Sequence, residues 1–179
     1  MIIFKETELK GAYLIEPEKF EDQRGFFARS FSQTEFAAHG LRTQFVEAAI
    51  SFNRRRHTLR GMHLQSPPHA QAKLVRCTRG AIYDVMIDLR PESPTYKQWF
   101  AETLTEENRL MLYVPEGFAH GFQTLEDNSE LFYQISATYD RPSERGVRWN
   151  DPAFAIRWPA SQGIIINERD RTYPDFQLG

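Results

Sequence analysis

The feature that most constrains the fold is a succession of short, strand-like segments that begins near Phe45. Residues 82–89 alternate so that one face is apolar while the other carries Asp84 and Asp88. A second alternating segment places five side chains on one face: Leu131, Tyr133, Ile135, Ala137 and Tyr139. Prolines stand at loop-like places along the run: Pro91, Pro94, Pro115, Pro142, Pro152 and Pro159. Many short strands with such turns predict an all-β antiparallel sandwich or barrel.

The first forty residues predict two extended segments and one helix. Residues 12–16 form a strand-like segment that stops at Pro17, and residues 26–31 form another after the turn signal at 21–25. Ser32 and Glu35 then have the S-x-x-E spacing of a capping box. We therefore predict a short helix that starts at Ser32 and that Gly40 can end.

Length and charge narrow the class of protein. A chain of 179 residues suits one domain, and we expect that domain to span residues 1–179 without repeats or linkers. The formal net charge of -2 predicts no nucleic-acid partner. One basic cluster, Arg54-Arg55-Arg56-His57, is interpreted as a solvated loop, with phosphate or partner binding as the alternative.

Other features bear on the cellular compartment. The single cysteine, Cys77, excludes an internal disulfide, suits a reducing compartment and favours a structural role for its thiol. The N-terminal residues do not have the pattern of a signal peptide. No apolar run approaches the roughly 18 residues of a membrane span. We expect a cytoplasmic protein without a membrane partner.

Two segments combine polar side chains with strand formers. Residues 58–65 contain Arg60, His63 and Gln65, and Lys73 follows eight residues later; residues 115–122 contain His120 beside glycines and aromatics. A histidine on a strand is usually a packing residue, but this company favours a pocket. The glycines there would let the backbone come close to a bound molecule.

Several familiar chemistries lack their signatures. The sequence contains neither a G-x-G-x-x-G segment that opens a helix nor a P-loop, and it shows no serine elbow or Cys/His nucleophile pattern. His63, His69 and His120 could suggest a metal, but no two of them have H-x-H spacing, and Lys73 would repel a cation. We therefore do not expect a metal site. The remaining groups, His63, Lys73, Tyr133 and several carboxylates, suit proton transfer.

Six segments, in order over residues 12–175, resemble the dTDP-4-dehydrorhamnose 3,5-epimerase family. Each segment alone is modest evidence, but their shared order makes the resemblance strong. They are Asp22-Gln23-Arg24-Gly25-Phe26-Phe27, Leu59-Arg60-Gly61-Met62-His63-Leu64-Gln65, Lys73-Leu74-Val75-Arg76-Cys77, Asp84-Val85-Met86-Ile87-Asp88-Leu89-Arg90, Pro115-Glu116-Gly117-Phe118-Ala119-His120-Gly121-Phe122 and Trp149-Asn150-Asp151-Pro152.

The resemblance implies a cupin-type jelly-roll β-barrel with a few short helices, a homodimer, and catalysis without a cofactor. The implied substrate is a nucleotide-diphosphate-linked 4-keto-6-deoxy sugar, epimerised at C3, C5 or both in deoxysugar or surface-polysaccharide biosynthesis. His63 would remove the proton next to the ketone, and Asp170 would orient its imidazole. Lys73 would stabilise the enolate oxygen, and Tyr133 would return a proton from the opposite face.

The resemblance also implies binding residues, for which alternatives stay open. Arg24 and Arg60 suit a pyrophosphate, because a guanidinium fork matches phosphate oxygens. The remaining candidates for substrate binding are Phe27, Gln65, His120 and Tyr139. Tyr133 and Tyr139 could instead be packing residues, and His120 could support a reactant, with Asp84 as its structural partner. Asp170 lies in a charged stretch whose default interpretation is a solvated tail.

The sequence departs from the family on the nucleotide side. Arg29 stands where family members that use a thymidine nucleotide have a glutamate, and Glu47 and Ala49 replace a glutamine and an asparagine. Arginine has only hydrogen-bond donors, so it cannot accept the N3–H of thymine, whereas cytosine presents acceptors. We therefore hypothesise that Arg29 and Glu47 bind CDP or GDP rather than dTDP. The competing functions are a 3,4-ketoisomerase on the same barrel and a nucleotide-sugar binding protein without turnover.

Overall fold

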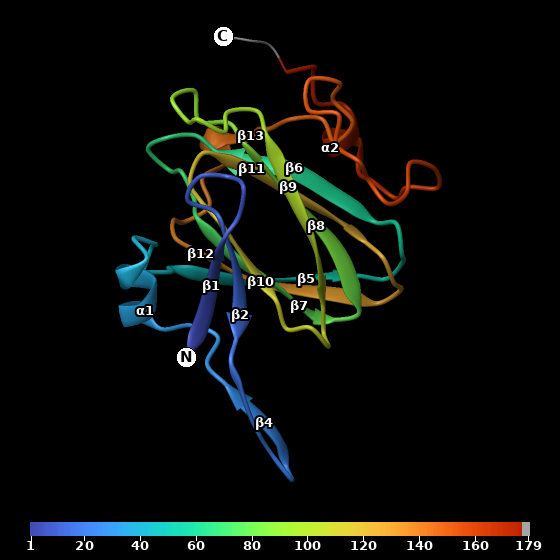
Figure 1. Ribbon diagram of the computed structural model, residues 1–179. Coiled ribbons are helices and arrows are strands. Elements are labelled where there is room, and N and C mark those ends of the chain that lie inside the picture. The colour runs from blue at the N-terminus through green and yellow to red at the C-terminus, as the bar shows by residue number, and fades with distance from the viewer. Residues whose placement is uncertain (177–179) are drawn as a thin grey trace.

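The computed structural model describes residues 1–176, so the last three residues of the expected domain lie outside the described part of the chain. Two antiparallel β-sheets face each other (Figure 1). In spatial order, one sheet contains β1 (Ile2–Glu6), β2 (Tyr13–Pro17), β10 (Met111–Val114), β7 (Lys73–Arg79), β12 (Ser129–Ile135) and β5 (Glu47–Asn53). The other contains β13 (Glu144–Gly146), β6 (Leu59–Gln65), β11 (Phe118–Thr124), β8 (Ala81–Asp88) and β9 (Trp99–Thr105). The all-β prediction is confirmed.

Smaller elements decorate the two sheets. The hairpin of β3 (Lys19–Asp22) and β4 (Gly25–Ala28) projects away from the body (Figure 1). The strand predicted at residues 26–31 is therefore shorter, and part of the predicted turn belongs to β3. The helical elements are α1 (Gln33–Ala38), a 3₁₀ helix at Arg141–Ser143 and α2 (Glu168–Arg171). No helix within residues 1–176 is long and apolar enough to cross a membrane.

Helix α1 begins and ends where the sequence predicted. The Ser32 hydroxyl accepts a hydrogen bond from the backbone N–H of Glu35, and the chain leaves the helix at Gly40, whose φ is +70°. The Glu35 carboxylate does not complete the capping box. It accepts instead from the N–H of Ile2 at 2.8 Å and from Arg29 at 3.2 Å, so it ties the helix to β1 and to the residue that follows β4.

The main core lies between the two sheets. It combines Val75 and Leu131 of the six-stranded sheet with Met86, Leu104 and other side chains of the five-stranded sheet. Burial of this apolar surface is the main term that holds the sheets together. Phe122 and Leu131 of this core also line a cavity between the sheets.

Strand β8 is buried on both faces, although its alternation suggested one apolar and one acidic face. Val85 and Ile87 pack beneath residues 147–158, which cover the outer face of the five-stranded sheet. On the inner face, Asp84 and Asp88 are fully buried and hydrogen-bonded to partners from the protein. Buried carboxylates need such partners. The two acidic residues of β8 therefore belong to internal hydrogen-bond networks and do not identify a solvent-exposed face.

Candidate active site

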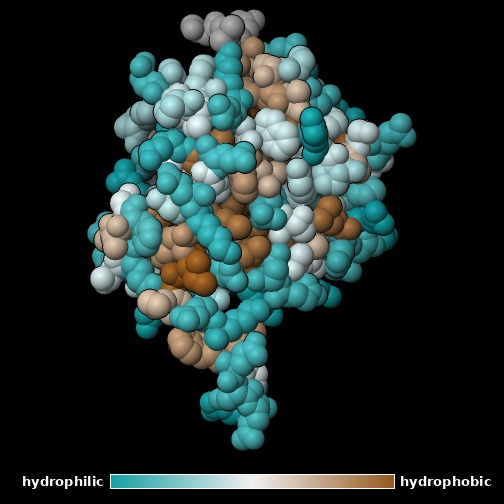
Figure 2. Space-filling view, in the orientation of Figure 1, coloured by the Kyte–Doolittle hydropathy of each residue, from teal (hydrophilic) through white to brown (hydrophobic). Residues whose placement is uncertain are grey.

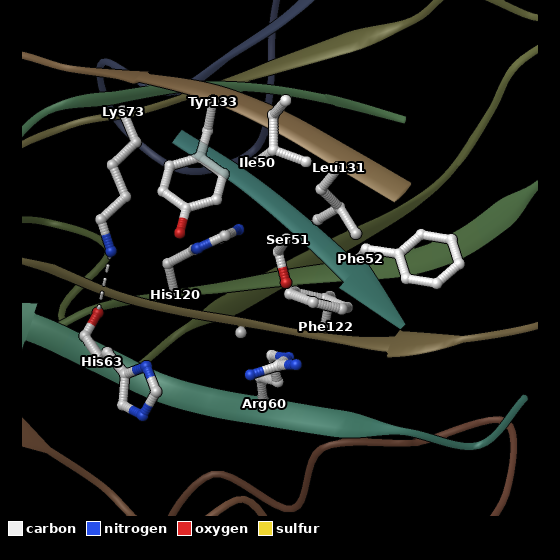
Figure 3. A pocket seen from close by; sticks show the side chains of 11 residues that line it. Ile50, Ser51, Phe52, Arg60, His63, Lys73, His120, Phe122, Leu131 and Tyr133 are labelled. Atoms are coloured by element: carbon white, nitrogen blue, oxygen red, sulfur yellow. Dashed lines mark hydrogen bonds between the residues drawn. The ribbon is translucent and has the colours of Figure 1, made fainter. Parts of the chain in front are cut away.

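A cavity of about 410 Å³ opens between the two sheets. Its size is typical of small-molecule sites. In Figure 3, His63 and Arg60 enter the cavity from β6, and Lys73 and Tyr133 enter from the facing sheet. Its lining side chains belong to Ile50, Ser51, Phe52, Arg60, His63, Lys73, His120, Phe122, Leu131 and Tyr133.

His63 is held by a buried carboxylate from the end of the chain. Its Nε2 lies 2.8 Å from Oδ1 of Asp170, whose other oxygen accepts the backbone N–H of Gly61 at 3.0 Å. An ionised Asp170 requires a proton on Nε2 of His63, which leaves Nδ1 as the basic nitrogen. This arrangement prepares the imidazole to accept a proton.

Asp170 is fully buried, so the solvated-tail interpretation is wrong for this residue. Helix α2 places it, with Asn167 as the N-cap that accepts the N–H of Asp170 at 2.7 Å. Burial alone would raise the pKa of Asp170. The hydrogen bonds and charges of His63, the Gly61 N–H and Arg169 outweigh burial and hold that pKa below its usual value, so the carboxylate stays ionised.

The Lys73 ammonium reaches toward the cavity from the first residue of β7. Its Nζ lies 3.5 Å from the backbone oxygen of His63, across the cavity (Figure 3). Burial lowers the Lys73 pKa from 10.5 to about 8, against the opposing attraction of Asp84 and Glu144. At neutral pH Lys73 is therefore still mainly protonated. No carboxylate within residues 1–176 forms an ion pair with this ammonium.

Tyr133 stands beside Lys73, because β12 and β7 are neighbours in the same sheet. The Tyr133 hydroxyl points into the cavity, toward His120 (Figure 3). Burial raises the pKa of this phenol above 10.0, against the opposing charge of Arg60. The phenol is therefore protonated at neutral pH and can donate. Tyr133 also packs against the main core. The packing interpretation is therefore compatible with the functional one, because the side chain contacts the core and its hydroxyl still reaches the cavity.

His120 forms a second histidine–carboxylate pair. Its Nε2 lies 2.9 and 3.0 Å from the two oxygens of the fully buried Asp84. The expected partnership with Asp84 is thus present. His120 faces His63 across the β6–β11 register, so two imidazoles border the same cavity. Each imidazole is hydrogen-bonded to a different carboxylate. No three His, Cys, Asp or Glu side chains within residues 1–176 converge to hold a metal ion.

The glycines beside the two histidines allow close contact between strands, and Gly121 also lines the cavity. Gly61 has a φ of +120°, and a Cβ on it would lie 2.5 Å from the Cα of Gly121. A Cβ on Gly121 would lie 2.6 Å from the backbone oxygen of Arg60. These two residues let β6 and β11 approach at the bulge between His120 and Phe122, which aims both histidines inward.

A smaller cavity of about 190 Å³ adjoins the first and shares His63, Lys73 and Tyr133 with it. Tyr139 lines this second cavity and donates its hydroxyl to Glu144 at 2.9 Å. Gln65 lines it too, but its amide donates to the carbonyls of His69 and Thr138 and accepts the N–H of Asp140. These contacts favour a structural role for Gln65 over the expected substrate binding.

Four predicted binding residues line neither cavity. Arg24 is exposed at the hairpin turn and pairs with Asp22, while Phe27 is 69% exposed on β4. Arg29 pairs with Glu35 at the start of α1. Glu47 begins β5 and makes no side-chain hydrogen bond within the described residues. The structure therefore does not bring Arg29 and Glu47 together as a base-binding pair.

The sequence analysis missed several residues around the cavities. Asn53 accepts Nε of Arg60 at 2.8 Å and fixes its guanidinium. Arg169 donates to Glu144 at 2.8 Å and lies 3.4 Å from Nε2 of His63. Ser51 lines the cavity with a hydroxyl that has no partner within residues 1–176. The position of Arg169 next to Asp170 in the sequence was a signal that could have identified it as a site residue. No sequence signal pointed to Asn53 or Ser51.

Together these side chains can carry out proton abstraction next to a carbonyl. An oriented imidazole, a cation for a developing oxyanion and a protonated phenol surround one cavity from two facing sheets. The imidazole belongs to one sheet, and the cation and the phenol belong to the other. A flat ring between the sheets would thus have a base on one side and an acid on the other.

Comparisons with known proteins identify relatives of this chain. The family model described as dTDP-4-dehydrorhamnose 3,5-epimerase matches residues 6–177. A relative of that name from Salmonella typhimurium is 41% identical over 175 residues, which are 97% of this chain and 95% of the relative. The crystal structure of dTDP-4-dehydrorhamnose 3,5-epimerase from Elizabethkingia anophelis is similar with a TM-score of 0.95 at 40% identity, covering 98% of this chain and 96% of that one. An epimerase from Legionella pneumophila, solved in complex with dTDP-4-keto-L-rhamnose, gives 0.88 at 33% identity, covering 95% and 90%.

Proposed function

The chain belongs to the dTDP-4-dehydrorhamnose 3,5-epimerase family, and from this premise we propose that it epimerises a dTDP-linked 4-keto-6-deoxy sugar in deoxysugar biosynthesis. It is an isomerase, and we propose that residues 1–179 act as one epimerase domain. The observation that carries the proposal is the placement of His63 and Tyr133 on facing walls of one cavity.

His63 is the proposed base. It removes the proton from the carbon next to the C4 ketone through Nδ1, while Asp170 stabilises the imidazolium that forms. The 2.8 Å contact with a fully buried carboxylate supports this role, because an unsolvated negative charge interacts strongly with a neighbouring cation. Asp170 is thus a positioning residue that acts through His63.

Lys73 is the proposed enolate-stabilising group. A C–H next to a ketone becomes acidic only if the enolate oxygen is stabilised, and preorganised charge of this kind contributes about 3 kcal/mol or more. The low pKa of Lys73 supports the role, because a partly unsatisfied ammonium gains most from a new negative partner. The developing charge on the C4 oxygen would be that partner.

Tyr133 is the proposed acid. Its phenol donates a proton to the face opposite His63, so the centre is inverted instead of restored. A raised pKa keeps the hydroxyl protonated until the carbanion forms. General acid catalysis of this kind contributes on the order of 10² to 10⁴ in rate.

We propose dTDP as the nucleotide carrier, in place of the CDP or GDP hypothesis. That hypothesis needed an Arg29 guanidinium free to bind the base, but Arg29 pairs with Glu35 at 3.2 Å. The relatives' names and the bound ligand of the Legionella pneumophila structure also favour dTDP. Calorimetry with dTDP, CDP, GDP and UDP tests the choice, and tightest binding of CDP or GDP would refute it.

We also propose a homodimer in which the hairpin of one copy completes the site of the other. Arg24 and Phe27 belong to a hairpin that projects away from the body of its own chain (Figure 1), and neither lines its cavities. The edge strand β5 exposes Ile50 at 65%, next to the exposed Val46 and Phe52. On the face seen in Figure 2, hydrophobic residues gather above the hairpin, whose tip is hydrophilic. An apolar edge of this kind needs a cover, and a second copy can supply it.

Mixing two inactive variants tests the shared site. His63→Ala and Arg24→Ala homodimers should each be slow. When the two are unfolded together and refolded, the mixed dimers contain one site with both residues intact, so activity should rise well above either parent. If the mixture stays as slow as its parents, Arg24 does not reach a partner's site.

The reaction itself is tested by NMR in D2O with a dTDP-linked 4-keto-6-deoxy sugar. The proposal predicts that solvent deuterium enters C3, C5 or both, with inversion, while the ketone remains at C4. Migration of the ketone to C3 would instead identify a ketoisomerase, and the absence of any exchange would leave only a binding protein.

A further inference from the structure

The basic cluster at residues 54–57 lies beside the mouth of the catalytic cavity. It belongs to the loop between β5 and β6, and Arg54 and Arg55 line a groove of about 380 Å³. We call this the Arg54 groove. Phe52 and Arg60 line both the groove and the catalytic cavity, so the two spaces meet along these side chains.

The Arg54 groove is rich in positive charge. Arg54 and Arg60 form no ion pair within residues 1–176, and Asn53, which orients Arg60, is neutral. Within residues 1–176, Asp127 is the carboxylate that bonds to the cluster: it pairs with Arg55 at 3.3 Å and accepts the backbone N–H of Arg56 at 2.8 Å. Within the described residues, one carboxylate thus bonds to a cluster that contains three arginines, in a chain whose formal net charge is -2.

The loop that presents these arginines is anchored. Two threonine hydroxyls, from Thr58 and Thr124, donate to the backbone oxygen of Arg55 at 2.7 and 2.8 Å. The N–H of His57 donates to the backbone oxygen of Thr124 at 2.8 Å. A loop fixed at this many points keeps its arginine stems at one edge of the groove, whereas a merely solvated loop would not need such anchors.

We propose that the Arg54 groove is a peripheral anion-binding subsite that captures a diphosphate ester before its sugar enters the cavity. The identity of the ligand rests on the function proposed above, whereas the affinity for a diphosphate does not. Anionic ligands are concentrated by clefts of opposite charge, and salt screens the effect when the charges are exposed. The solvated-loop interpretation of the cluster predicts neither property.

Inorganic pyrophosphate tests the subsite without any turnover. In ¹H–¹⁵N spectra of the whole protein, pyrophosphate should shift the amides of residues 54–58, and Arg54→Glu should abolish these shifts. Arg54 is suited to substitution because it is exposed and unpaired within the described residues. Shifts confined to residues around His63 and Lys73 would overturn the proposal.

Steady-state kinetics test the capture step. Near 10 mM ionic strength, Arg54→Gln should lower kcat/KM about fivefold with kcat unchanged, and near 0.5 M the difference should vanish. Arg157→Gln is the matched control, because Arg157 is exposed and lines neither the groove nor the cavities. A wild-type value of kcat/KM for Arg54→Gln at low salt, or a loss that persists at high salt, would overturn the proposal. A wild-type protein that fails to epimerise would refute the function but leave the pyrophosphate result to decide the subsite.

Discussion

Replacing Asp170 by asparagine tests how the site prepares its base. The substitution keeps the shape of the side chain and removes its charge, while the Nε2 of His63 stays 2.8 Å from that position. Two charge centres about 4 Å apart interact by ~4 kcal/mol at an effective dielectric constant of about 20. Because the imidazolium forms in the transition state, kcat should fall by about 10³.

Two neighbouring contacts increase this effect. Arg169 lies 3.4 Å from Nε2 of His63, so without the Asp170 charge it would repel the imidazolium. An asparagine whose oxygen accepts the Gly61 N–H would turn its NH₂ group toward His63. The histidine would then be protonated on Nδ1, the nitrogen that should act as the base.

The assay is deuterium exchange and epimerisation by Asp170→Asn, alongside the affinity for dTDP. We expect dTDP binding close to that of the wild type, because Asp170 does not line either cavity. Asp151→Asn is the matched control: Asp151 is almost as buried, accepts the N–H groups of Ala153 and Phe176, and lines neither cavity. Both variants should lose stability, but only Asp170→Asn should lose kcat. A folded Asp170→Asn protein with kcat within tenfold of the wild type would refute the role of the charge.

The remaining predictions concern Lys73 and Gly61. Lys73 has a pKa of about 8 in the folded state and 10.5 in the unfolded state. Between these two pH values the unfolded chain binds more protons than the folded one. The free energy of unfolding should therefore rise with pH, by about 3 kcal/mol in total. Denaturant titrations should show this rise in the wild type and not in Lys73→Met, which should be more stable at pH 7. An equal dependence of the free energy of unfolding on pH in the two proteins would contradict the burial of the charge. In the same pH range kcat/KM of the wild type should fall as pH rises above about 8, and a flat profile to pH 10 would argue against an ammonium at the ketone. Gly61→Ala should destabilise the fold by ~3 kcal/mol or more, because its Cβ would meet Gly121 at 2.5 Å. Gly25 has a similar φ of +123°, but a Cβ on it would have no neighbour within 4 Å, so Gly25→Ala should destabilise the fold less. An equal loss of stability in the two variants would show that backbone strain, and not the contact with Gly121, causes the effect.

Local pattern was sufficient for much of the fold. Alternation predicted the strands, and the S-x-x-E spacing with Gly40 predicted α1, because both depend on neighbouring residues. Alternation could not show that β8 is buried on both faces. That outcome depends on residues 147–158, which reach the outer face only after the chain has folded back over it.

The site shows the same division. Residue types and family resemblance identified His63, Lys73 and Tyr133, which the fold brings to one cavity. The partnership of His63 with Asp170 spans 107 residues, and no local pattern reveals a contact at that distance. The contact of Gly61 with Gly121 could not be predicted for a related reason, because the backbone it approaches lies on another strand. Arg24 and Phe27 illustrate a further limit, since a single chain does not bring them to a cavity.

The most direct test of an acid and a base on opposite faces is Tyr133→Phe in D2O. Without the phenol, His63 can still remove the proton and return deuterium to the same face, so NMR should show exchange at the carbon next to the ketone with its configuration retained. Epimerised product should fall by on the order of 10² to 10⁴. Inversion by Tyr133→Phe at the wild-type rate would contradict the account.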